Sequence, residues 1–226
     1  MISRHMERVP GYRSPVLPSD LLARIHALNS DYLELLATGS FASDDLDGNP
    51  CARSIGTQLR ELSHDQRARL AAAPYALYSL RLDHSRCWRD PCSVMALVAS
   101  ERYRPSEVSA EALFCETVLL QAWHVANTSP LAARVVYAMT DAARTWLASA
   151  PLWLLKKLAL EHSRVLTPRW PANPCFWPDL LRFAREDDRA RLATTQLLGL
   201  QLVAVELESA RETRAVEIGN RRQEHP

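Results

Sequence analysis

Histidine and cysteine side chains occur close together in one segment of the chain. His84 is followed by Cys87 and Cys92, and two thiolates with an imidazole are three of the four ligands that a structural zinc site needs. Cys51 or Cys175 would have to supply the fourth ligand from elsewhere in the sequence. Structural zinc sites usually contain two close cysteine pairs, and this sequence has none. We therefore expect no metal, and we interpret Cys87 as packing against the tryptophan beside it.

Arginines and tryptophans occur side by side in two segments, and these segments form a candidate binding surface. Its residues are Arg81, Arg86, Trp88 and Arg89 in the first segment and Arg164, Arg169, Trp170 and Trp177 in the second. Guanidinium groups beside aromatic rings suit phosphate contact, base stacking or a protein interface. A solvated arginine that lies over an exposed tryptophan explains the same pattern, so the residues alone leave both interpretations open.

The sequence contains no arrangement that predicts a catalytic centre. The spacing of Cys115 and His124 places them on opposite sides of one expected helix, which argues against a nucleophile and its base. Asp44-Asp45 and Asp187-Asp188 lie in a polar loop and at a helix start, without the apolar surroundings that raise a carboxyl pKa. Glycine-rich phosphate loops, serine elbows and zinc-protease motifs are absent. We expect no cofactor and favour a protein that is not an enzyme; an enzyme without a recognisable motif is the less favoured alternative.

Composition excludes several classes of protein. The 226 residues include 27 basic and 26 acidic side chains, for a formal net charge of +1. A strongly basic nucleic-acid binder is therefore excluded as the dominant character. Six glycines are too few for most hairpin-rich or phosphate-loop folds, and abundant Ala, Leu and Arg favour helix.

Apolar residues recur at helical spacing along most of the chain, which predicts an all-α fold. We expect an irregular bundle of about eight to nine helices, in two halves that pack together. The expected divisions are an irregular arm at 1–18, a first helical half at 19–104, a second helical half at 105–210 and a polar tail at 211–226. The segment Tyr75 to Leu82 is the exception, because its alternation predicts a short strand or an extended connector.

Capping signals set several of the expected boundaries. Ser63 and Gln66 resemble a capping box, which predicts a break between two helices near Leu62. The last helix is expected from about Asp187 to Glu208, with Leu192, Thr195, Leu198, Gly199, Leu202, Val205 and Glu206 on one face.

The ends and the cysteines indicate a cytoplasmic protein. The first 20 residues lack the apolar core of a secretory signal, and no apolar stretch reaches the length that spans a bilayer. Five cysteines without a regular framework are typical of free thiols in a reducing compartment. We expect no membrane association.

The two halves match each other at an offset of 88 residues. Arg69-Leu70-Ala71 aligns with Lys157-Leu158-Ala159, and Arg81 then aligns with Arg169. Cys87 with Trp88 aligns with Cys175 and Phe176. The match predicts an internal repeat, although leucine-rich helices in an arginine-rich chain can also match by chance.

Both halves resemble the FlhD family, the helical subunit of the flagellar master transcriptional activator. In the first half the similarity runs from Leu22 through Asn29 and Tyr32-Leu33 to Arg81-Leu82-Asp83. In the second half it covers Gln121-Ala122-Trp123, Ala138-Met139-Thr140, Leu158-Ala159 and Arg169-Trp170. Leu82 and Trp170 stand where the family has Phe. The family's DNA-contacting region has no recognisable match here, so no DNA-contacting residue is carried over.

The resemblance implies a tandem pseudo-dimer and a bacterial regulatory protein that acts through a protein partner in transcriptional control. DNA contact would be weak alone or supplied by that partner, because tight independent binding needs several uncompensated phosphate contacts. The alternative is a protein-protein adaptor or assembly component without a nucleic-acid role. The partner and the oligomeric state are left open by the sequence.

Overall fold

The chain forms nine helices and one two-stranded sheet in the part that the structure describes, which confirms the expected all-α fold. The computed structural model describes residues 17–39, 50–82, 109–163 and 166–223. The elements before residue 83 are α1 (Ser19–Thr38), α2 (Pro50–Arg60), α3 (His64–Ala71) and β1 (Tyr78–Ser79). Those after residue 108 are α6 (Ala110–Thr128), α7 (Pro130–Tyr137), α8 (Asp141–Ser149), α9 (Leu152–His162), β2 (Thr167–Pro168), α10 (Phe176–Arg185) and α11 (Arg189–Gln223).

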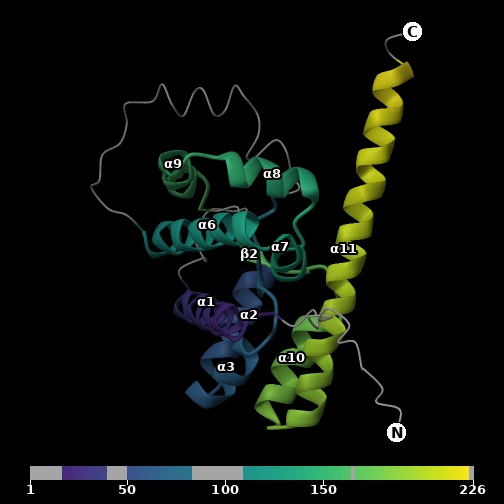
Figure 1. The fold of residues 1–226 in the computed structure, drawn as a ribbon. Coiled ribbons are helices and arrows are strands. Elements are labelled where there is room, and N and C mark those ends of the chain that lie inside the picture. Colours follow the sequence, from purple (N-terminus) through teal and green to yellow (C-terminus); the bar gives the residue numbers. More distant parts are fainter. Residues whose placement is uncertain (1–16, 40–49, 83–108, 164–165, 224–226) are drawn as a thin grey trace, which may run out of the picture.

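Two groups of helices lie one above the other in Figure 1. The lower group contains α1, α2 and α3, and the upper group contains α6 to α9, with the strands between them. The helix α10 packs against α3 and α2, so an element from late in the chain covers the first group. Buried residues of both groups belong to one continuous hydrophobic core, and they therefore fold around a shared interior.

Local capping explains where the helices begin and end. The side chain of Ser63 accepts a hydrogen bond from the Gln66 amide and the side chain of Gln66 accepts one from the Ser63 amide, which confirms the capping box and the break before α3. Thr140 caps α8 in the same way through the amide of Ala143. At the other end of α1, Gly39 adopts a left-handed conformation (φ 80°) and closes the helix on the carbonyls of its last turn.

A pair of short antiparallel strands joins the two groups. Tyr78 lies opposite Pro168 and Ser79 lies opposite Thr167. Within the segment Tyr75 to Leu82 only Tyr78 and Ser79 form a strand, and the residues before and after them bend or turn, so the short strand expected there is present but the burial does not alternate along the whole segment. Because each strand contributes only two residues, the pairing fixes the relative position of the groups without building a layer of its own.

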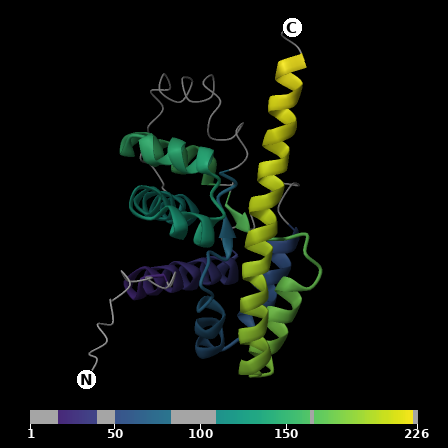
Figure 2. The same ribbon diagram turned by 45° about the vertical axis from the view of Figure 1, so that its right-hand side comes forward.

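The last helix, α11, differs from its expected course. It begins at Arg189 and continues to Gln223, well beyond Glu208, because its last turns contain mostly good helix formers and no proline. Leu198 and Val205 were expected on its buried face, but they are exposed, and Val203 is buried instead. Figures 1 and 2 both show the C-terminal part of α11 rising above the helices that pack against its base.

Several expectations fall outside the described residues. These are most of the arm at 1–18, the polar loop that contains Asp44 and Asp45, and the candidate metal ligands His84, Cys87 and Cys92. Among the described helices, none combines the length and the hydropathy needed to cross a bilayer.

Asn29 is the buried polar centre of the first helical group. Its amide donates to the carbonyl oxygens of Ala71 (3.1 Å) and Tyr75 (2.9 Å), and its oxygen accepts from the amide of Leu77 (2.9 Å). The side chain is fully buried, so its hydrogen bonds take the place of water on the backbone groups of the connector between α3 and β1. One side chain of α1 thereby holds the whole connector in place.

Asn29→Asp should lower the free energy of unfolding by about 3 kcal/mol or more, because a carboxylate cannot donate to the carbonyl oxygens around it. Urea denaturation followed by circular dichroism measures the change. Asn127→Ala is the matched control, since that exposed asparagine bonds only within its own helix. A loss for Asn29→Asp no larger than that of the control would contradict the assigned role.

Gly56→Ala should lower the free energy of unfolding by about 1–3 kcal/mol. A Cβ at this position would lie 2.3 Å from the carbonyl oxygen of Leu36, so α1 and α2 would have to separate. Ser54→Ala, on the exposed side of the same helix, should leave stability unchanged or slightly raised. Equal stability of the two variants, measured by thermal unfolding, would show that the close approach of α1 to α2 is not required.

Candidate functional site

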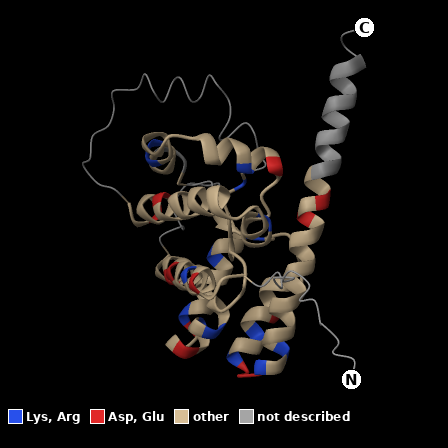
Figure 3. Ribbon diagram, in the orientation of Figure 1, with Lys and Arg blue, Asp and Glu red and all other residues tan. Residues whose placement is uncertain are grey.

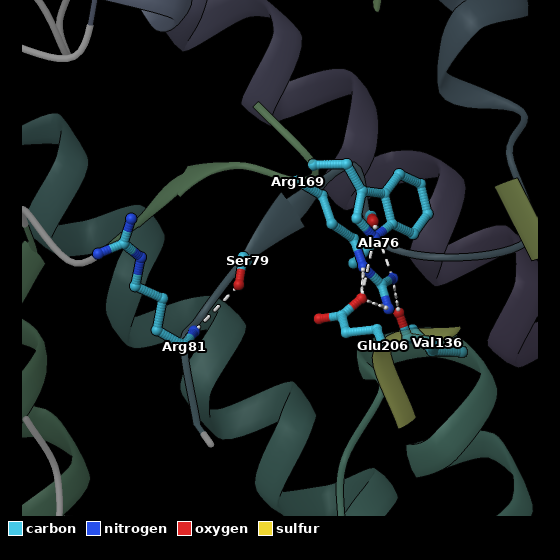
Figure 4. Close-up of polar contacts among 7 residues, drawn as sticks. Ala76, Ser79, Arg81, Val136, Arg169 and Glu206 are labelled. Atoms are coloured by element: carbon cyan, nitrogen blue, oxygen red, sulfur yellow. Dashed lines mark hydrogen bonds and ion pairs between the residues drawn. The ribbon is translucent and has the colours of Figure 1, made fainter. Parts of the chain in front are cut away.

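The guanidinium group of Arg169 lies in the interior, where α7, α11 and the connector before β1 meet. Its side chain is only 2% exposed. Nη1 donates to the carbonyl oxygens of Val136 (2.8 Å) and Ala76 (3.2 Å), and Nε donates to Glu206 Oε2 (3.1 Å). Figure 4 shows these partners arranged around the guanidinium. We call Arg169 with its partners Ala76, Val136, Glu206 and Trp170 the Arg169 cluster.

The electrostatics of the Arg169 cluster follow from burial and from one counter-charge. Nη2 of Arg169 also lies 3.1 Å from Glu206 Oε2, so the carboxylate faces both the Nε and the Nη2 side of the guanidinium. Burial lowers the pKa of Arg169, and the charge of Glu206 opposes that shift. A buried arginine remains charged under these conditions, because its ordinary pKa is far above neutrality. Glu206 is therefore the group that makes the buried cation tolerable.

Aromatic rings complete the surroundings of the guanidinium. The Arg169 Cζ lies 4.6 Å from the centroid of the Trp170 ring and 5.9 Å from that of Tyr75. The indole of Trp170 donates to the same Glu206 oxygen at 3.0 Å. Burial raises the pKa of Tyr75, whose hydroxyl donates to the Gln196 carbonyl of α11 at 2.8 Å. The Arg169 cluster holds α11 through Glu206, and Tyr75 holds the same helix through the carbonyl of Gln196.

The residues of the candidate binding surface do not form one exposed face. Arg169 and Trp177 are buried, and the Trp177 indole donates to the Arg169 carbonyl at 2.7 Å. Trp170 is half-buried in the Arg169 cluster, whereas Arg81 is exposed and its side chain points away from that cluster (Figure 4). Arg86, Trp88, Arg89 and Arg164 lie outside the described residues. The prediction that Arg169 and Trp177 belong to a binding surface is therefore wrong. Both are interior residues whose side chains donate hydrogen bonds to groups of the protein itself.

The sequence placed Glu206 on the inward face of the last helix but did not identify it as the partner of Arg169. That partner could have been found, because Glu206 is the first charge after the uncharged run 192–205. The carbonyls of Ala76 and Val136 could not, since only the tertiary fold brings them to Arg169.

The described residues offer no arrangement for metal or nucleophilic chemistry. No group of three or more potential metal ligands occurs among them. Cys115 is buried and His124 is exposed, as their spacing in α6 predicts, and burial raises the pKa of the Cys115 thiol to about 12. The Arg169 cluster uses its donors on internal acceptors, so its chemistry is structural: it holds a buried charge and fixes α11.

Arg169→Lys should lower the free energy of unfolding by about 3 kcal/mol or more, because a single ammonium cannot reach two carbonyls and a carboxylate at once. Arg182→Lys is the control, since that exposed pair with Asp179 contributes little. Guanidinium denaturation of both variants measures the difference. Near-equal values would mean that the internal contacts of Arg169 contribute no more than a surface pair.

Comparison with known proteins identifies no relative of this chain. Models of protein families, curated proteins and solved structures were compared with the chain, and none of them matches it.

Proposed function

We propose that this protein is a helical regulatory protein, similar to the FlhD family, that acts through a protein partner in transcriptional control. The two halves would be copies of one helical unit, which together form a pseudo-dimer within a single chain. The proposal rests on one observation, the matching ends of β1 and β2.

The observation is a repeated backbone conformation. Arg81 follows the end of β1 by two residues and has a φ of 48°, and Trp170 follows the end of β2 by two residues and has a φ of 51°. Positive φ is uncommon for residues other than glycine, so two such residues at equivalent places argue for a common origin. Antiparallel pairing of two like strands is also what a local two-fold axis produces. This equivalence aligns Arg81 with Trp170, one residue away from the match seen in the sequence.

The elements before each strand support the same relationship. The helix α3 precedes β1 as α9 precedes β2, and they carry the matched pairs Leu70-Ala71 and Leu158-Ala159. All four side chains are buried. Each of these helices also packs on the long helix that opens its half, α1 or α6, and the two long helices contact each other.

The arginines on the surface of α3 and α10 have acidic neighbours, which supports the proposal that any contact with DNA requires a partner protein. Arginines of α3 and α10 gather at the lower end of the molecule in Figure 3, together with acidic residues. Arg69 lies 2.6 Å from Asp187, and Arg185 lies 2.6 Å from Glu61. Because these cations already have acidic neighbours, they do not form the uncompensated track that binds phosphates tightly.

Chromatin immunoprecipitation of the tagged chain tests the proposal in the organism of origin. We expect enrichment at a defined set of promoters that disappears when the gene of the co-purifying protein is deleted. Purified chain should not shift those promoter fragments at about 0.15 M salt, whereas the chain with its partner should.

Two results would contradict the proposal. Absence of promoter enrichment, while the partner still co-purifies, would favour the adaptor or assembly component. A strong shift by the chain alone, with a steep dependence on salt, would contradict the need for a partner.

A further inference from the structure

The outward side of α11 carries a regular line of exposed residues. These are Arg191, Thr194, Leu198, Gln201, Val205 and Glu208, which we call the outer seam. Their spacing alternates between three and four residues, which is the spacing by which one helix packs along another. Leu198 is 50% exposed and Val205 57%, and Leu197 beside them is 62% exposed. The seam thus has the pattern of a contact but no described residues covering it.

The opposite side of α11 is anchored to the described core, so the outer seam points away from that core. Leu192, Thr195 and Val203 are buried there, and Gly199 lies against the Tyr75 ring. Glu206 points inward to Arg169. Rotation of α11 to hide the seam would therefore break the Arg169 cluster and force Tyr75 against another part of the helix.

The seam has one charge at each end, of opposite sign. Arg191 is basic and Glu208 is acidic, and the one charged residue between them in the sequence, Glu206, points inward to Arg169. Figure 3 shows residues 192–205 as a tan stretch of α11 between the coloured ends. Arg191 lies 3.5 Å from Asp188, but this pair is exposed and therefore weak, and it leaves the guanidinium able to meet another acid.

The seam is complementary to itself when two copies run in opposite directions. Arg191 then lies opposite Glu208, Thr194 lies opposite Val205, and Leu198 lies opposite Gln201. Every seam residue meets another seam residue in one register, which is the requirement for a two-fold symmetric contact. A parallel arrangement would instead place Arg191 against Arg191 and Glu208 against Glu208.

We propose that the outer seam of α11 binds the same seam of a second copy of this chain, with the two helices antiparallel. The contact buries Leu198 and Val205 of both copies over about 26 Å of helix. This proposal is independent of the proposed function, because the pseudo-dimer lies within one chain and the seam lies on its outside.

Sedimentation velocity of the full chain over a range of concentrations tests the contact. The wild-type chain should form a dimer, and Leu198→Glu should raise the dissociation constant at least about tenfold, because it places an unpaired carboxylate in the contact. Leu152→Glu on α9 is the matched control, an exposed leucine (46%) away from α11, and should leave the dimer unchanged. Circular dichroism verifies that each variant keeps its helix content.

Charge exchange tests the direction of the helices. Arg191→Glu and Glu208→Arg should each weaken the dimer, and the double variant should restore it to within about threefold, because each exchanged charge again meets its opposite. The proposal is overturned by a wild-type chain that stays monomeric at its highest soluble concentration, or by a dimer that Leu198→Glu leaves intact. A double variant no better than the single ones overturns the antiparallel register, and a monomer that needs Leu198 to bind a different protein assigns the seam to that protein.

Discussion

The buried, charged guanidinium of Arg169 is the group on which the arrangement of this fold depends. Arg169 has lost its water, so every strong donor on it requires an acceptor within the protein. Two backbone carbonyls accept from Nη1, and the Glu206 carboxylate accepts from Nε and lies 3.1 Å from Nη2; these groups come from three segments far apart in the sequence. The connector before β1, the end of α7 and the middle of α11 must therefore stay together. Separation of any one of them would leave a buried charge without its partner.

The same constraint explains the geometry around the short strands. The amide of Arg169 donates to the Leu77 carbonyl at 2.9 Å, next to the pairing of β1 with β2. Trp170 then turns back through a left-handed conformation, which brings its indole to Glu206 beside the guanidinium. A two-residue strand pair is weak alone. It is held here because the buried ion pair and the side chain of Asn29 fix the segments on both sides of it.

Anchoring of α11 by its inward face has a consequence for the surface. Gly199 admits the Tyr75 ring and Glu206 reaches Arg169, so the rotation of the helix about its axis is fixed. The uncharged residues on the other side of α11 therefore point away from the described core. Arg69 of α3 and Arg185 of α10 lie beside the acidic side chains of Asp187 and Glu61, so their charges are largely compensated within the protein.

Local sequence determined most of the helices. The helix caps at Ser63, Ser109 and Thr140 and the short strand before Arg81 depend on neighbouring residues, so they are features that a local sequence can specify. The end of α11 was missed, because a polar composition looks like a tail although its residues favour helix. The sequence does not show which arginines are buried, because Arg81 and Arg169 both have apolar residues on either side. Only the tertiary structure decides between them, since it alone brings two carbonyls and Glu206 to one guanidinium and leaves the other in water.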